Sequence, residues 1–188
     1  MRRCLFVMAA VSFLSISIAA SAQTTFVYTA NTLGSSISIY KLNTTTGTLT
    51  ATGGSPFQAD SPAYLAPAAA GKFLVVSGGS CPFCGLQTFG INPTIGALTL
   101  SHSYEQIGSV DFLVGQIAQD TAGTTIYTQG TLSGGASVGV IDALHVNADG
   151  SLSQIGTPFS FGQNIGNGEG PIAVDPKGRW VFAVAFGK

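Results

Sequence analysis

Short apolar runs alternate with turn residues along most of the chain, and one arrangement of them recurs. It is clearest in residues 170–184, where an apolar segment, an Asp-Pro-Lys-Gly turn and a second apolar segment follow one another. Proline presets φ for the first central position of such a turn, and Gly178 tolerates the positive φ that closes it. Related segments occupy residues 62–76 and 115–127. The pattern predicts pairs of antiparallel strands, and no window shows the period of a helix.

Each predicted strand pair is followed by two further strands, so the repeating unit contains four. The second strands of successive units begin at Phe26, Phe73, Thr125 and Trp180. The third strands end in turns that run from asparagine to glycine, at residues 43–47, 92–96 and 147–150, and a fourth strand follows each turn. Four strands per unit and a period of about 50 residues are typical of β-propeller blades. A β-sandwich also has short strands, but nothing in that architecture repeats a four-strand register.

The repeat places individual residues within the blades. We expect Leu65, Ile117 and Ile172 on innermost strands, and Phe26, Phe73 and Trp180 at the start of second strands. The expected fold class is all-β, a β-propeller of four-stranded antiparallel blades with about three and a half blades present. Propellers close with roughly four to eight blades, so the ring is incomplete. The chain is then either the amino-terminal part of a longer product or one of several copies in a ring.

The composition agrees with an all-β fold, and the first residues have the pattern of a signal peptide. The chain has 45% hydrophobic residues, 25 glycines and only 8% charged residues, too few for the polar faces of helices. Arg2-Arg3, an apolar run over residues 5–20 and Ala20-Ser21-Ala22 have the order of an export signal peptide. We therefore expect a signal peptide at 1–22, a domain at 23–188 and a periplasmic or extracellular location. A retained membrane anchor is the alternative, but the apolar run is short for a span.

The charge that remains after cleavage limits the partners. Five basic residues stand against eight acidic ones, and no basic cluster occurs. Nucleic-acid binding is not expected, because release of counterions from phosphates requires clustered cations. A small molecule, a carbohydrate or a protein at the mouth of the central channel is the expected partner, and no cofactor is implied.

Three segments carry a family resemblance. Residues 171–182 read Pro-Ile-Ala-Val-Asp-Pro-Lys-Gly-Arg-Trp-Val-Phe, residues 46–50 read Thr-Gly-Thr-Leu-Thr, and Phe26–Asn31 is close to Tyr-Val-Thr-Asn. Together they resemble the lactonase-like propellers, which include bacterial 6-phosphogluconolactonases and grade into surface propellers with Tyr-Val-Thr-Asn repeats. The resemblance covers essentially the whole domain. It implies seven blades and a lactone-opening site with arginine, histidine and glutamate at one channel mouth.

The residues of that implied site cannot be located in this chain. Family members often carry Pro-Arg-His just before an innermost strand, whereas residues 61–64, 114–117 and 170–173 contain no Arg-His pair. Arg179, the one arginine after the leader, begins a second strand at the opposite end of its blade. The expected function is therefore a binding or scaffold module without a complete catalytic site. The alternative is a lactonase, a carboxylic ester hydrolase, whose site lies mainly on blades beyond Lys188.

The candidate site residues are three acids on the connections that lead into innermost strands: Asp60, Asp111 and Glu169. Such connections converge on a channel mouth in propellers, so these carboxylates could face a ligand or a cation together; solvated loop acids are the simpler interpretation. His145 lies in a third strand at a position that tolerates any residue. His102 is expected to follow a fourth strand near the rim. A solvent-facing or inter-blade role is expected for both.

Cys81-Pro-Phe-Cys84 has the form of a thiol redox motif, but the surrounding chemistry is missing. The segment lies between a second and a third strand, and no helix follows to lower a thiol pKa. A tetrahedral metal site would need two more ligands, and none lies nearby in sequence. A local disulfide in an oxidising compartment is the favoured interpretation; redox, metal and free-thiol roles stay open.

Overall fold

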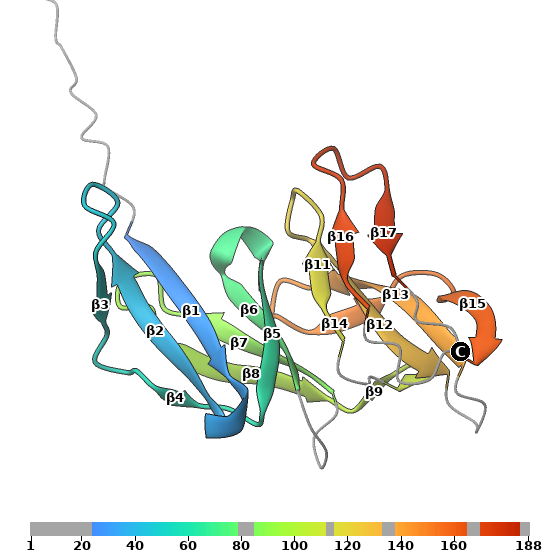
Figure 1. Ribbon diagram of the computed structural model, residues 1–188, viewed down its shortest axis with the longest axis horizontal. Helices are drawn as coiled ribbons and strands as arrows, with labels where there is room; N and C mark the ends of the chain where they lie inside the picture. The colour runs from blue at the N-terminus through green and yellow to red at the C-terminus, as the bar shows by residue number, and fades with distance from the viewer. Residues whose placement is uncertain (1–23, 79–84, 112–114, 133–137, 165–169, 185–188) are drawn as a thin grey trace, which may run out of the picture.

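The computed structural model describes residues 24–78, 85–111, 115–132, 138–164 and 170–184. Within these residues the fold is all-β, apart from two 3-10 turns, η1 (Thr32–Gly34) and η2 (Ala69–Gly71). The strands form four antiparallel sheets, one for each sequence repeat, arranged side by side in an open stack (Figure 1). None of the described residues belongs to a helix that could span a membrane. The predicted fold class is confirmed.

The first two sheets are named blade 1 and blade 2. Blade 1 lacks an innermost strand in the described part of the chain and consists of β1 (Thr25–Asn31), β2 (Ser36–Leu42), β3 (Leu49–Ala51) and β4 (Phe57–Gln58). Strands β3 and β4 pair with opposite ends of β2, so together they take the fourth position. Blade 2 has the complete order: β5 (Pro62–Ala68), β6 (Phe73–Gly78), β7 (Leu86–Ile91) and β8 (Leu98–Tyr104).

Blade 3 and blade 4 continue the same register. The core of blade 3 is β11 (Ile117–Gln119), β12 (Thr125–Leu132), β13 (Val138–Val146) and β14 (Leu152–Gln154). Three further strands, which the repeat did not predict, extend it: β9 (Gln106–Ile107), β10 (Val110–Asp111) and β15 (Phe159–Asn164). Strand β10 pairs with β12, and β15 pairs with β13. Blade 4 is represented by its two inner strands, β16 (Ile172–Val174) and β17 (Val181–Ala183).

The placements predicted from the repeat are confirmed. Leu65, Ile117 and Ile172 lie in β5, β11 and β16, which are innermost strands. Phe26 and Phe73 lie at the start of β1 and β6, and Trp180 directly precedes β17. The boundary of one fourth strand was wrong, because β8 continues to Tyr104 and therefore contains His102. The longer strand forms because Gln87 and Leu86 of β7 find partners in Ser103 and Tyr104.

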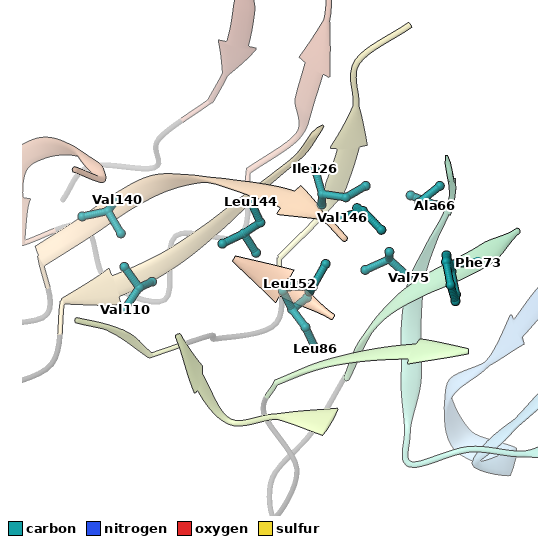
Figure 2. Close-up of a cluster of buried hydrophobic side chains, with 11 residues drawn as sticks. Ala66, Phe73, Val75, Leu86, Val110, Ile126, Val140, Leu144, Val146 and Leu152 are labelled. Carbon is teal, nitrogen blue, oxygen red and sulfur yellow. The ribbon is translucent and has the colours of Figure 1, made fainter. Parts of the chain in front are cut away.

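Apolar side chains fill the spaces between blades, because successive residues of a strand point to opposite faces of its sheet. Between blades 2 and 3, Phe73, Val75 and Leu86 lie in one cluster with Ile126, Val146 and Leu152 (Figure 2). Between blades 1 and 2, Ile37 and Ile39 face Leu74, Val76 and Phe89. Each blade is thus stabilised mainly by burying its two faces against its neighbours.

An aromatic–glycine contact repeats at both of these interfaces. The ring of Phe26 in blade 1 lies against Gly96 in the turn between the third and fourth strands of blade 2. The ring of Phe73 lies against Gly150, the corresponding glycine of blade 3. An ideal Cβ at either glycine would come within 2.5 Å of a ring carbon, so only glycine permits this approach. The Asn-to-Gly turns predicted from sequence therefore fix how closely the blades pack.

Candidate functional site at the start of the innermost strands

Side chains near the end of second strands fasten each blade to the start of the next innermost strand. The Ser77 hydroxyl of blade 2 donates a 2.9 Å hydrogen bond to the Gly115 carbonyl, just before β11. Gln129 occupies the equivalent register position in blade 3, and its Oε1 accepts a 3.1 Å bond from the Gly170 N–H. In blade 1 the Thr32 hydroxyl donates to the Pro62 carbonyl at 2.8 Å. We call these three contacts the inter-blade clasps.

Amide side chains reinforce the clasp between blades 3 and 4. Gln129 is 4% exposed, and its Nε2 also donates to the Val184 carbonyl at 3.4 Å. Gln116 Oε1 accepts a 3.3 Å hydrogen bond from the Ile172 N–H in β16. The bond to Gly170 satisfies a buried main-chain N–H, and such a group costs about 1–3 kcal/mol when it lacks a partner. The clasps hold successive innermost strands so that they begin at the same end of the stack.

The candidate acids Asp60 and Asp111 lie a few residues before the main-chain groups that the clasps bind, but their surroundings differ. Asp60 is exposed, two residues before Pro62, and it lines a cavity of about 300 Å³ with Gln87 and Phe89 between blades 1 and 2. Asp111 is half-buried and lies in β10 rather than in a loop, opposite Thr131. The loop placement predicted for Asp111 was wrong, because the innermost strand of blade 3 is divided into β10 and β11. Glu169, Cys81 and Cys84 lie outside the described residues, so their assignments stay predictions.

The basic residues lie away from this end of the blades. Arg179 forms an ion pair with Asp175 at 2.9 Å in the turn before β17, at the opposite end of blade 4, as the sequence predicts. Burial raises the pKa of Asp175, but the Arg179 side chain and the main-chain N–H groups of Trp180, Arg179 and Lys177 outweigh it and lower that pKa. Arg179 is therefore committed to the turn and does not supply a cation at the channel mouth.

The two histidines have the kinds of surroundings predicted for them. His145 is exposed on β13, and His102 stacks on Tyr104 with ring centroids 6.1 Å apart on β8. The Tyr104 hydroxyl accepts a 2.9 Å bond from the Leu152 N–H, so it joins blade 2 to blade 3. No group of three or more His, Cys, Asp or Glu among the described residues could hold a metal ion.

One buried acid was missed by sequence reasoning. Asp142 on β13 is completely buried, and its Oδ2 accepts a 3.0 Å hydrogen bond from Gln154 Nε2. Its Oδ1 has no hydrogen-bond partner within the part of the chain that the structure describes. Burial raises the pKa of Asp142, and hydrogen bonds from Gln154 and the Ala143 N–H oppose that rise. The alternation of β13 contains the signal, because Asp142 lies between the buried Val140 and Leu144 on one face.

A second cavity lies at the other end of blades 1 and 2. Its volume is about 570 Å³, and β1 and β5 form its walls through Phe26, Tyr28, Leu65 and Pro67. Lys72 supplies one cationic side chain. The Tyr28 hydroxyl donates a 2.9 Å bond to the Gly96 carbonyl, and burial raises its pKa. The size suits a small ligand, but neither Asp60 nor Asp111 lines this space.

With this geometry established, the sequence can be compared with known families. Residues 15–114, more than half of the chain, match the family described as Lactonase, 7-bladed beta-propeller. The chain belongs to this family. The lactonase-like resemblance predicted from the blade repeats is thereby confirmed, and the family's arrangement accounts for the open stack of four sheets.

Solved structures show the same fold. A protein from Bacteroides fragilis, proposed to be a 6-phosphogluconolactonase, is 20% identical with a TM-score of 0.63 over 89% of this chain and 46% of its own. The periplasmic gluconolactonase PpgL of Pseudomonas aeruginosa is 19% identical with a TM-score of 0.60, over 88% of this chain and 48% of its own. The chain thus spans less than half the length of these structures. Comparison with curated proteins finds no match.

Proposed function

We propose that these blades form part of a propeller that binds a sugar lactone at its channel mouth and takes part in opening it. The family match over residues 15–114 carries this proposal. It is supported by two similar structures, one named as a periplasmic gluconolactonase and one proposed to be a 6-phosphogluconolactonase. Arg2-Arg3 and the apolar run after them support action outside the cytoplasm. This proposal reverses the order of the two functions expected from the sequence.

The chemistry explains which groups the described blades can supply. Hydrolysis adds water to the ring carbonyl and breaks the ester C–O bond, so that a hydroxy acid is released. A carboxylate can take the proton from the attacking water, and donors or a cation must stabilise the oxyanion. Asp60 and Asp111, next to the clasped strands, are the described carboxylates suited to the first role. Glu169 would be a third by its place in the sequence.

The second role has no candidate among the described residues at this end of the blades. Arg179 is paired with Asp175 at the far end, and both histidines lie on third or fourth strands. We therefore propose that the described blades bind and position the ligand, and that hydrolysis needs cationic groups from additional blades. A purely binding or scaffold role is the second candidate, favoured by the commitment of Ser77, Gln116 and Gln129 to inter-blade hydrogen bonds.

The test separates binding from hydrolysis. The purified chain is incubated with gluconolactone and its 6-phosphate, and acid release is followed in a pH-stat against buffer. Binding of gluconate, the stable product, is measured by NMR titration. We expect no hydrolysis above the buffer rate, together with gluconate binding that Asp111→Asn weakens. The control Glu105→Gln, an exposed acid between β8 and β9, should bind as the wild type does.

Each contrary outcome has a definite meaning. Lactone opening by this chain, lost in Glu169→Gln, would overturn the need for additional blades and make Glu169 catalytic. Absence of gluconate binding would overturn the sugar-lactone assignment and favour the scaffold role. Equal binding by Asp111→Asn and the wild type would remove Asp111 from the site.

A further inference from the structure

The cavity of about 300 Å³ between blades 1 and 2 lies among the outer strands, and we call it the outer cavity. The end of β4 and the residues after it, 57–60, form its wall on blade 1. Gln87 and Phe89 on β7 and Leu100 on β8 form its wall on blade 2. Its walls thus come from third and fourth strands and one connection, not from the innermost strands around the channel.

Gln87 presents a buried amide to the outer cavity. It is 5% exposed, and β7 holds it between Val76 and Ser103 of the neighbouring strands. Alternation along β7 puts Gln87 on the same face as Phe89, which packs toward blade 1. The Gln87 amide has no hydrogen-bond partner among the described residues. Burying an amide without a partner is costly, so this side chain is placed to bind a ligand in the cavity.

The Asp60 carboxylate lies on a main chain that is held on both sides. The Ala59 N–H donates a 3.0 Å hydrogen bond to the Ser35 carbonyl, and the Pro62 carbonyl accepts the 2.8 Å bond from Thr32. Asp60 itself is exposed, and none of the residues that line the outer cavity is basic. A ligand therefore meets a carboxylate on a backbone that needs little further ordering.

The remaining wall of the outer cavity is apolar. The rings of Phe57 and Phe89 meet edge to face, with centroids 5.5 Å apart and an interplanar angle of 81°. Leu100 is 50% exposed beside them. The cavity thus combines an apolar surface with one carboxylate and one primary amide.

This combination of groups selects among classes of ligand. An anion would meet the Asp60 carboxylate with no cation to offset the repulsion. An ammonium group would pair with Asp60 and the Gln87 carbonyl oxygen, but it would leave the amide donors of Gln87 without an acceptor. An apolar ligand would leave both polar groups unpaired. Neutral hydroxyls satisfy both, because they donate to the carboxylate and both donate to and accept from the amide.

We propose that the outer cavity binds a neutral pyranose unit of a carbohydrate, with hydroxyls on Asp60 and Gln87 and the C–H face of the ring on Phe57 and Leu100. The volume is at the lower end of the range for ligand pockets, so it admits one ring. This binding is a further function and does not require lactone opening. Asp60 is the one residue shared with the proposed lactone site, since Asp111 does not line the outer cavity.

The experiment follows the main-chain amide signals of the labelled chain by NMR during titration with methyl α-glucoside, a neutral sugar that has no lactone. We expect the signals of Asp60, Gln87 and Phe89 to shift. Gln87→Leu should weaken binding about tenfold, because the ligand hydroxyls lose their amide partner. Methyl glucuronoside, which carries a carboxylate, should bind more weakly than the glucoside. Asp60→Asn should remove this preference, and because Asp60 is exposed it tests the site even if Gln87→Leu fails to fold.

Two controls separate this site from the rest of the stack. Gln129→Leu makes the same change at a glutamine that is 4% exposed but lies outside the outer cavity, and it should bind the glucoside as the wild type does. Asp111→Asn, which should weaken gluconate binding, should also leave glucoside binding unchanged.

Three results would overturn the proposal. The first is the absence of any glucoside-dependent shift, or equal binding by Gln87→Leu and the wild type. The second is a set of shifts confined to Asp111 and Gly115, which would place the sugar at the channel mouth and favour the lactone site instead. The third is tighter binding of benzylammonium than of the glucoside at the same signals, which would make the outer cavity a cation site.

Discussion

The ring of Phe73 occupies the place where a side chain on Gly150 would begin, since an ideal Cβ there would lie 2.5 Å from a ring carbon. Gly150 also has a φ of +85°, which disfavours every other residue. We expect Gly150→Ala to lower the free energy of unfolding by about 1–3 kcal/mol beyond the cost of its φ, as overpacking does. Urea denaturation measures this loss.

Gly71→Ala is the matched control for this effect. Gly71 has a φ of +80°, but no atom lies within 4 Å of its ideal Cβ. It therefore bears the backbone strain without the ring contact. Equal losses for the two variants would show that φ alone requires glycine, and that the aromatic–glycine contact does not set the spacing of blades 2 and 3.

The Gln129 clasp gives a second prediction. Replacing Gln129 by leucine removes the acceptor for the Gly170 N–H and the donor to the Val184 carbonyl, while the volume stays similar. We expect a loss of about 1–3 kcal/mol, concentrated in blade 4. Hydrogen exchange should become faster in β16 and β17 and remain unchanged in β5–β8. Gln58→Leu, at an exposed position of β4, should change neither; uniform acceleration over all blades would contradict a local clasp.

Part of this organisation could be predicted from the sequence because it is local. Asn43, Asn92 and Asn147 each open a turn that closes on a glycine, and these turns mark blades 1, 2 and 3 on their own. The clasps could not be predicted in this way. Ser77 and Gln129 share a register position but differ in chemistry, and their partners Gly115 and Gly170 lie about 40 residues away in the sequence. What recurs is the hydrogen-bonding position, not the residue type.

In the candidate site, too, the sequence predicts local features but not contacts between distant residues. Asp60 and Asp111 were identified because the repeat places both just before innermost strands. Asp60 does precede β5, whereas Asp111 lies within β10. The strand β10 that holds Asp111 has only two residues, so its sequence is too short to indicate pairing with β12. Asp142 was missed because a single acid within an apolar strand forms no motif with its neighbours in the sequence. The burial of Val140 and Leu144 on either side nevertheless places Asp142 on the buried face of β13.

Asp142 gives a prediction about pH. Because burial raises its pKa in the folded state, the folded protein keeps the proton at a pH where the unfolded chain has lost it. The contribution to stability is complete below the unfolded pKa of about 4 and is lost as pH rises through the folded pKa. Compared with Asp142→Asn, the wild type should therefore lose unfolding free energy as the pH rises above about 4. Urea titrations at several pH values measure the difference.

Asp149 provides a control of opposite sign. Hydrogen bonds from the Ser151 N–H and hydroxyl lower its pKa in the folded state. Its contribution is therefore present above the unfolded pKa and lost as pH falls through the folded one. Relative to Asp149→Asn, the wild type should gain stability as pH rises toward neutrality. If the unfolding free energy changed with pH in the same way for both pairs, the cause would be a general charge effect. That result would contradict a pKa of Asp142 raised by burial.

The last prediction concerns Cys81 and Cys84, which lie outside the described residues. The strands on either side are already joined, because the Gly78 N–H donates a 2.9 Å bond to the Gly85 carbonyl and β6 pairs with β7 along its length. A disulfide that closes so short a ring removes little entropy from the unfolded chain. Reduction should therefore leave the unfolding midpoint of the protein nearly unchanged and speed hydrogen exchange only near Gly78 and Gly85. Mass spectrometry of exported protein should find the bridged peptide, whereas alkylation of both sulfurs in folded, oxidised protein would exclude the bridge.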